Sequence, residues 1–163
     1  MRRITLIAFG LSVLSAMPCS AQSETASKYT ISVNATTEDD IGKQFAYAIR
    51  EELRKSAKYA LIEDGSLSAY QISLVTLDPN EGRSQTMTVA AVTLTAVNMA
   101  SLFLNEKVAS ISQSPLFNLR LLFASWVRTV GSSRVEDSAR SLVASVDKEV
   151  IELRDRVNKF VPK

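Results

Sequence analysis

The feature that most restricts the fold is a long apolar stripe near the C-terminus. Its positions recur at steps of three and four residues: Val135, Ala139, Leu142, Val146, Val150 and Leu153. This period is that of an amphipathic helix, which is stable when its apolar face packs on a second layer. Ser133 and Glu136 have the spacing of a capping box at its start, and we expect the helix to end near Val157.

A second amphipathic helix is expected in the first half of the chain. Its apolar positions are four residues apart: Ile41, Phe45, Ile49 and Leu53. Thr37 and Asp40 resemble a capping box at its N-terminus. Three basic residues near its other end, Arg54, Lys55 and Lys58, complement the helix dipole, although they would also suit a ligand-facing basic patch.

The remaining periodic segments have the composition of strands. They cover residues 29–35, 59–62, 69–77, 86–97 and 119–130. The turn at 78–82 contains Pro79 and Gly82 and joins the third and fourth segments as a hairpin. The apolar phase of the fourth segment shifts near Ala90 and Ala91, as a bulge or a strand buried on both faces would produce.

These elements predict an α+β fold with a mostly antiparallel sheet of four to five strands and two amphipathic helices packed on one face. We expect a single domain at 29–158, preceded by a flexible tether at 22–28 and followed by a tail at 159–163. Residues 98–118 fit no period well, and they are expected to form a long, partly covered excursion.

The first 21 residues have the three-part design of a secretory signal peptide. A basic pair at 2–3 is followed by a mostly apolar stretch at 4–17 and by small residues at 19–21. This stretch is shorter than the roughly twenty residues of a membrane-spanning helix, so we expect cleavage after Ala21 and a periplasmic or secreted product. An uncleaved anchor and a lipoprotein attached at Cys19 are the alternatives.

Cleavage would change the composition. The chain has 19 basic and 17 acidic residues, and removal of Arg2 and Arg3 leaves 17 of each, a net charge of zero. A neutral domain does not favour nucleic acid or an anionic membrane surface as its partner.

The single cysteine, Cys19, would also be removed, so the mature domain would form no disulfide. The sequence has no histidine, which excludes Ser-His-Asp and Cys-His catalysis, and we expect neither a cofactor nor a metal.

Without histidine and without a cysteine in the mature domain, catalysis by carboxylates is the alternative that remains. Acidic residues cluster at 38–40, 63–64 and 136–137, but each cluster lies where a helix start or a turn explains it. Ser132 and Ser133 before the last helix would suit an anion, although capping also explains them. Residues 84–105 carry no charge and are about long enough to cross a bilayer, but their threonines favour a strand.

The last predicted strand carries the best candidates for binding a partner. Arg120, Trp126 and Arg128 would form a cationic and aromatic surface, with Trp126 as the anchor. The alternative is that Trp126 packs in the core or at the edge of the sheet.

Residues 29–153 resemble small domains of the bacterial envelope. The resemblance is carried by the helical segment 45–53, which leads through Lys58 and Tyr59 into a strand, and by Ala69–Leu74, which opens the hairpin. The similar families are the N-terminal domain of the Tol translocation protein and the lipoprotein activators of penicillin-binding proteins. Residues 126–140 are also similar to the end of uncharacterised exported bacterial proteins. These resemblances imply an envelope domain and assign no functional residue.

We therefore expect an exported accessory or interaction domain without catalytic activity, which binds a protein partner of the cell envelope. The exposed edge of its sheet would accept a strand of the partner by β-augmentation. One alternative is a carrier of a small ligand, in which residues 98–118 form a lid over an apolar pocket. A hydrolase that uses carboxylates and serine is a third hypothesis. The oligomeric state does not follow from the sequence.

Overall fold

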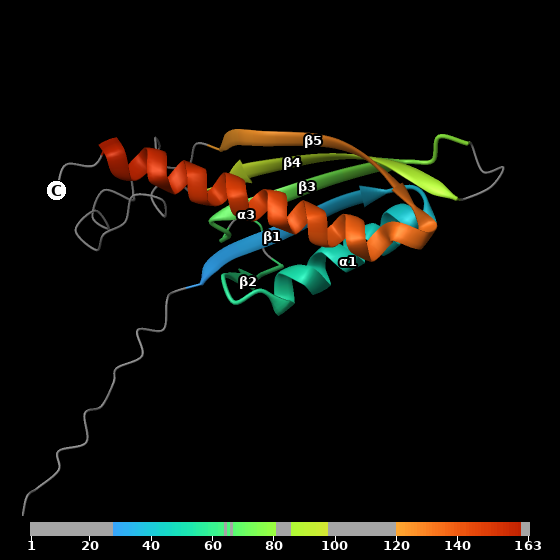
Figure 1. Ribbon diagram of the computed structural model, residues 1–163, viewed down its shortest axis with the longest axis horizontal. Coiled ribbons are helices and arrows are strands. Elements are labelled where there is room, and N and C mark those ends of the chain that lie inside the picture. Colours follow the sequence, from blue (N-terminus) through green and yellow to red (C-terminus); the bar gives the residue numbers. More distant parts are fainter. Residues whose placement is uncertain (1–27, 64, 66, 81–85, 98–119, 161–163) are drawn as a thin grey trace, which may run out of the picture.

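A computed structural model describes residues 28–63, 65, 67–80, 86–97 and 120–160 (Figure 1). Its elements are β1 (Tyr29–Thr37), α1 (Asp40–Lys55), β2 (Tyr59–Leu61), β3 (Tyr70–Leu77), β4 (Met87–Ala96), β5 (Leu121–Gly131), η3 (Ser132–Arg134) and α3 (Val135–Phe160). The expected signal peptide at 1–21, the expected excursion at 98–118 and all but the last residue of the expected tether lie outside the described residues.

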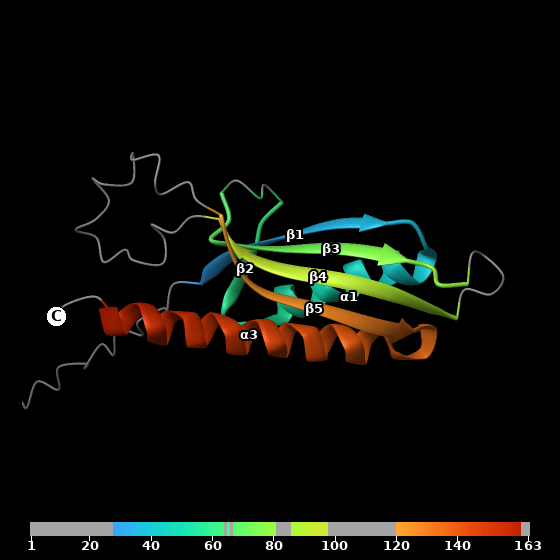
Figure 2. The same ribbon diagram turned by 90° about the horizontal axis from the view of Figure 1, so that it is seen from above.

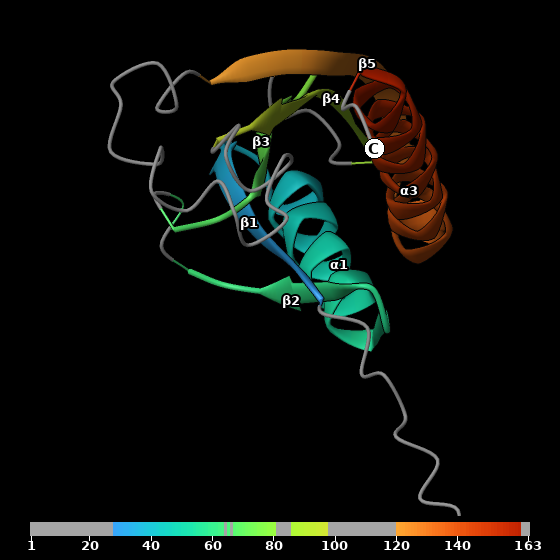
Figure 3. The same cartoon turned by 90° about the vertical axis from the view of Figure 1, so that its left-hand side faces the viewer.

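The five strands form one mixed sheet in the order β2-β1-β3-β4-β5. β1 pairs in parallel with both β2 and β3, because α1 carries the chain back over the sheet before β2 begins. The β3/β4 pair is antiparallel, as the predicted hairpin requires. The β4/β5 pair is also antiparallel. The predicted α+β fold is confirmed, with both helices on the same side of the sheet (Figure 3).

The core lies between this side of the sheet and the two helices. The apolar stripe of α1 is buried, since Ile41, Phe45, Ile49 and Leu53 are at most 3% exposed. The stripe of α3 is buried from Val135 to Val150, and Leu153 packs at the margin of the core. The largest buried side chains of β3 are Tyr70, Ile72 and Leu74, which alternate toward the helices. The two predicted helical faces therefore cover the sheet as expected.

The N-terminus of α1 differs from the expected capping box. Thr37 is the last residue of β1, and the N-cap is Asp39, whose carboxylate accepts a hydrogen bond of 2.6 Å from the Gly42 N–H. A Cβ atom at Gly42 would lie 2.0 Å from the Thr76 hydroxyl oxygen, so a glycine lets the first turn sit directly on β3. The helix ends at Lys55, where the Ser56 N–H bonds the Leu53 carbonyl, and not near Lys58.

The expected disturbance of the fourth strand near Ala90 and Ala91 is wrong. The helix-facing side chains of β4 alternate without interruption through residues 88, 90, 92, 94 and 96. The register shifts instead between Leu94 and Thr95, where β5 contains Phe123 as an additional residue. The phase of β4 looked shifted because its outward side chains, such as Ala91, are also apolar.

The start and end of the last helix also differ from expectation. Ser133 lies inside the short 3₁₀ turn η3, and α3 begins only at Val135. The helix continues to Phe160, past the expected end near Val157 and into the expected tail. Among the described residues, no helix has the length and apolar character needed to span a membrane. The described part of segment 84–105 forms β4.

Candidate interaction surface

Two of the three predicted partner-binding residues face the helices. Trp126 lies opposite Val92 of β4, which is 1% exposed, and its indole is partly buried against the core. Arg128 is on the same side of β5, and its guanidinium donates hydrogen bonds of 3.1 and 3.0 Å to the hydroxyls of Ser141 and Ser145. This arginine therefore fastens the edge strand to α3, which runs back along β5 (Figure 2).

The third predicted residue lies apart from these two. Arg120 precedes β5 and donates a hydrogen bond of 3.4 Å to the side-chain carbonyl of Gln71. Gln71 alternates with the helix-facing residues of β3, so it lies on the opposite side of the sheet from Trp126 and Arg128. The structure therefore does not bring the three side chains onto one surface, and their role in binding a partner stays a prediction.

The side of the sheet that faces away from the helices is the more conspicuous surface, and we call it the open face. In the described strands its side chains are Thr30, Ser32, Asn34, Thr36, Ala60, Gln71, Ser73, Val75, Leu77, Met87, Val89, Ala91, Thr93, Thr95, Leu122, Ser125, Val127 and Thr129. None of these side chains is charged. This surface was not predicted from the sequence, although charged residues are missing from the outward positions of four adjacent strands of the sheet.

The exposed apolar part of the open face is centred on β4. Val75, Ala91 and Val127 are neighbours across three strands, and Leu77, Val89 and Thr129 form the next row. Val127 is 77% exposed, Leu77 55% and Val75 48%. A row of this kind leaves apolar side chains in water, which is unusual for the central strands of a sheet.

The other end of the open face is more polar and better covered. The Ser32 hydroxyl lies 3.0 Å from the Ser68 hydroxyl, and both side chains are buried by the segment that precedes β3. Gln71 is only 8% exposed beneath this segment and Arg120. Ser32 and Gln71 are therefore withdrawn from a partner, whereas Leu122 at this end of β5 is 57% exposed. The exposed apolar side chains of three adjacent strands lie at the end that contains Val75, Leu77 and Val127.

A buried carboxylate lies at the opposite side of the sheet from this surface. Asp39 is 2% exposed, and besides capping α1 it accepts a hydrogen bond of 2.9 Å from the Thr88 hydroxyl. Burial raises its pKa, but the hydrogen bonds that the carboxylate accepts, first those from the Gly42 N–H and the Thr88 hydroxyl, lower it, and the net effect holds the pKa below its ordinary value of 3.8. Asp39 is therefore ionised at neutral pH and serves as a structural acceptor.

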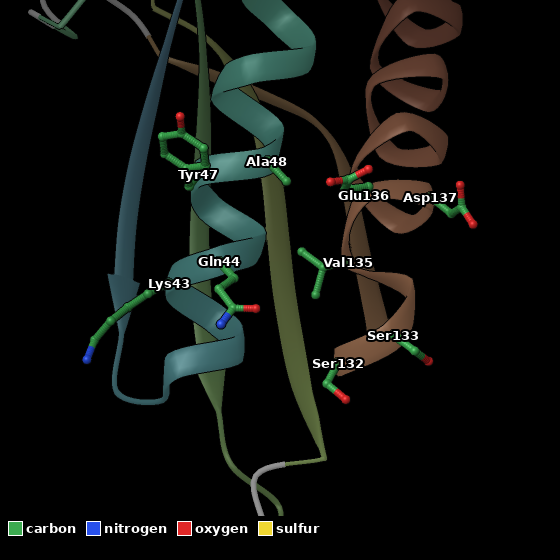
Figure 4. Close-up of a pocket in the computed structure, with 9 residues that line it drawn as sticks. All are labelled: Lys43, Gln44, Tyr47, Ala48, Ser132, Ser133, Val135, Glu136 and Asp137. Carbon is green, nitrogen blue, oxygen red and sulfur yellow. The ribbon is translucent and has the colours of Figure 1, made fainter.

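A cleft of about 630 Å³ separates the first half of α1 from the start of α3 (Figure 4). Gln44, Ala48 and Val135 face one another across it, whereas Lys43 and Asp137 point away. These two charged groups also have partners on their own helices, since Lys43 pairs with Asp40 and Asp137 with Arg140. Ser132 and Ser133 line the lower end of the cleft, which is open to solvent and contains no convergent set of polar groups.

A smaller and more apolar pocket of about 330 Å³ lies at the other end of α3. It is lined by Tyr29, Ala57, Lys58, Tyr59, Asp147, Val150, Ile151 and Arg154. At its rim, the Lys58 ammonium pairs with the Asp147 carboxylate at 3.0 Å, and the Arg154 guanidinium stands 5.4 Å from the centre of the Tyr29 ring. Burial raises the pKa of Tyr59, and the adjacent Asp147 carboxylate raises it further.

Beside this pocket, a buried aromatic cluster closes the same end of the sheet. The ring of Tyr70 meets Tyr29 and Phe123 edge to face, with centroids 5.9 and 6.0 Å apart. The Tyr70 hydroxyl is buried and has no hydrogen-bond partner among the described residues, and burial raises the pKa of Tyr70 to about 12. This tyrosine therefore stays protonated and acts as a packing residue.

Comparison with known proteins gives matches of fold only. No known protein family matches the sequence, and no curated protein is similar to it. The hypothetical protein CT253 from Chlamydia trachomatis has a similar structure, with a TM-score of 0.51 and 9% identity over 77% of this chain and 99% of that chain.

Two structures of the PelC dodecamer from Paraburkholderia phytofirmans are also similar, with TM-scores of 0.42 and 0.40. They have 15 and 18% identity, over 76 and 75% of this chain and 87 and 88% of the PelC chains. None of these matches concerns the Tol protein or the activators of penicillin-binding proteins, so that resemblance stays a prediction.

Proposed function

We propose that this protein is an exported, non-catalytic binding module that recognises a protein partner of the bacterial envelope through its open face and the adjoining edge strand β5. The observation that carries the proposal is the exposed row Val75, Ala91 and Val127, on a face whose described strands contribute no charged side chain. Apolar side chains on a flat, uncharged surface lose hydration favourably when a partner covers them.

The edge of the sheet adds a second means of contact. β5 is eleven residues long and is the last strand of the described sheet, paired with β4 alone. Its only charged residue is Arg128, and that side chain is bound to α3. Edge strands that lack outward charges readily accept another strand. A partner strand added to β5 would extend the open face without a break.

We propose that the protein is not catalytic because its described carboxylates either have structural hydrogen-bond partners or are exposed to solvent. Among the described residues, Asp39 is the acidic side chain buried from solvent, and its oxygens are occupied by α1 and Thr88. Glu136 and Asp137 at the wide cleft are exposed. General acid and base catalysis needs groups whose environments separate their pKa values, and these carboxylates are not paired in that way.

Export is proposed from the sequence of residues 1–21 alone. It is tested by mass spectrometry of the protein recovered from the periplasm or medium of a bacterial host that expresses the full chain. We expect a mass that corresponds to a start at Gln22. Recovery of the uncleaved chain from the cytoplasm would contradict this part of the proposal.

Binding is tested with the tagged full chain in envelope extract, compared with two variants. The double variant Val75→Lys/Val127→Lys places charges on the open face, whereas Ala144→Lys places one on the exposed side of α3. We expect a protein, identified by mass spectrometry, to be recovered with the wild type and with Ala144→Lys and to be lost with the double variant. The purified partner must then bind with the same dependence. Equal recovery by all three proteins would refute the open face as the binding surface.

The apolar pocket favours a second candidate function, the carrying of a small ligand. Its volume of about 330 Å³ lies at the lower end of the range for ligand pockets. The lid expected at 98–118 lies outside the described residues, so the proposal concerns the pocket alone. Medium-chain alkyl carboxylates and alkyl amines are suitable probes, with Ala57→Trp as the variant that fills the pocket. A probe that raises the melting temperature of the wild type but not of Ala57→Trp would support the carrier function.

A further inference from the structure

We infer that the apolar pocket beside the second half of α3 binds the anion of a medium-chain carboxylic acid, with the alkyl chain inside and the carboxylate held at the rim by Arg154. This inference rests on the carrier function, the second candidate function of this protein, and it names the class of ligand and the residue that selects it. Three properties of the pocket support it: its walls, its charge and its size.

The walls of the pocket come from three parts of the chain and are mostly apolar. α3 contributes Val150 and Ile151, and the segment that leads into β2 contributes the methyl group of Ala57. The ring of Tyr29 on β1 forms a further wall, and the buried ring of Tyr70 supports it at a centroid distance of 5.9 Å. Ile151 is 48% exposed, so an alkyl chain in the pocket would remove apolar surface from water.

The charged groups at the rim leave one positive charge without a partner. Asp147 is compensated, because one oxygen of its carboxylate lies 3.0 Å from the Lys58 ammonium. The hydroxyl of Tyr59 beside this carboxylate stays protonated, because burial raises its pKa, and it adds no charge. Arg154 stands 5.4 Å from the centre of the Tyr29 ring and forms no ion pair with the described carboxylates. Two cations against one carboxylate favour an anionic head group.

Arg154 is placed to hold a carboxylate at the end of an alkyl chain. It follows Ile151 by three residues, so the two side chains are neighbours on one face of α3. Its N–H groups donate no hydrogen bond within the described part of the chain, and a guanidinium binds a carboxylate through two parallel hydrogen bonds. An alkyl amine would meet the same guanidinium as a like charge, which disfavours its binding.

The size of the pocket limits the length of the alkyl chain. Its volume is about 330 Å³. A water molecule occupies roughly 30 Å³ of the liquid, so the pocket takes a ligand of about ten non-hydrogen atoms. Octanoate has this size. Octylamine and 1-octanol have an alkyl chain of the same length with a cationic and a neutral head group, so the three ligands separate the effect of charge from that of the chain.

The test is isothermal titration calorimetry of the protein, expressed from the full chain, with octanoate, octylamine and 1-octanol. We expect octanoate to bind about fivefold or more tightly than the other two, because its head group alone pairs with Arg154. Arg154→Gln should weaken the binding of octanoate by about five- to tenfold and leave that of 1-octanol unchanged. Arg154→Lys keeps the charge but not the paired hydrogen bonds, and it should retain part of the preference for octanoate.

Arg156→Gln is the matched control. It removes the same charge from the same helix, but Arg156 pairs with Glu152 and does not line the pocket, so octanoate should bind this variant as it binds the wild type. Circular dichroism and melting curves establish that each variant is folded. Nuclear magnetic resonance supplies the position: octanoate should shift the methyl resonances of Ala57 and Ile151 and leave that of Ala144, on the exposed side of α3, in place.

The contrary outcomes separate the inference from the function on which it rests. Octylamine that binds as tightly as octanoate, or octanoate binding that Arg154→Gln leaves unchanged, would overturn the inference and leave the carrier function standing. Binding that shifts neither Ala57 nor Ile151 would place the ligand outside the pocket and refute both. The absence of binding by all three ligands would also refute both, whereas the binding of a protein partner by the open face would be unaffected.

Discussion

Replacement of Asp39 by asparagine should destabilise the protein at neutral pH and have little effect in acid. The carboxylate accepts hydrogen bonds of 2.6 Å from the Gly42 N–H and 2.9 Å from the Thr88 hydroxyl, and it is 2% exposed. Loss of an N-cap costs about 1 kcal/mol, and a hydrogen bond to a charged group contributes about 1.5–3 kcal/mol. Because asparagine retains a neutral acceptor, we expect a loss of about 1–3 kcal/mol in the free energy of unfolding.

The pH dependence follows from the direction of the pKa shift. The pKa of Asp39 in the folded protein lies below its ordinary value of 3.8, so the unfolded chain binds the proton more tightly than the folded one. The stabilisation is therefore complete above the unfolded pKa and is lost as the pH falls through the folded pKa. The difference between the wild type and Asp39→Asn should shrink accordingly when the pH is lowered from neutral to below 3.8.

Urea unfolding followed by circular dichroism, at neutral pH and at successive acidic pH values, measures this difference. Asp40→Asn is the matched control, because Asp40 is the next residue and its carboxylate, 66% exposed, pairs with Lys43 at the surface. An exposed pair of this kind contributes less than about 1 kcal/mol. A penalty for Asp39→Asn that is the same at every pH, or no larger than that of Asp40→Asn, would refute the assignment of Asp39 as a buried, ionised cap.

Three further substitutions test the packing around the sheet. Gly42→Ala should cost about 1–3 kcal/mol in thermal or urea unfolding, because the added Cβ would lie 2.0 Å from the Thr76 hydroxyl oxygen, and a normal stability would show that this contact relaxes freely. Arg128→Gln should speed amide hydrogen exchange in β5 relative to β3, because it removes two hydrogen bonds to α3, and unchanged exchange would contradict that role. Leu142→Ala should lower the free energy of unfolding by about 2–5 kcal/mol, because Leu142 is buried. Ile151→Ala, at a 48% exposed position, should lower it far less. Similar losses for the two variants would mean that the other face of α3 packs on the sheet.

The sequence did not predict correctly which side of the sheet each of the three candidate partner-binding residues faces. Arg120, Trp126 and Arg128 were grouped because all three fall in the predicted strand 119–130. A strand that alternates without interruption would place these even-numbered residues on one side. Phe123 is an additional residue in β5, so Arg120 falls out of this alternation and contacts Gln71 on the other side of the sheet. A single unpaired residue in a strand leaves no reliable trace in an apolar pattern, because residues on both sides of this strand are apolar.

The start of α1 could not be predicted from the local sequence for a similar reason. Thr37 and Asp39 are both good N-cap residues, and local spacing does not distinguish them. The choice depends on where β1 stops pairing with β3, and the register continues to Thr37 opposite Thr76. Asp39 is then the residue that reaches Thr88 on β4, which is 49 positions away in the sequence. A long-range contact of this kind fixes the cap and is invisible in a local pattern.

The sequence by itself determined the two helical faces, the hairpin and the α+β class, because each depends on a period of apolar residues within a short window. It also determined that no histidine is available and that the single thiol lies at Cys19. Only the tertiary structure decided which side of the sheet the helices cover, and therefore that Val75, Ala91 and Val127 share an exposed, uncharged row. The reason is that both sides of these strands contain apolar residues, so burial is assigned by the position of α1 and α3 and not by the strands themselves.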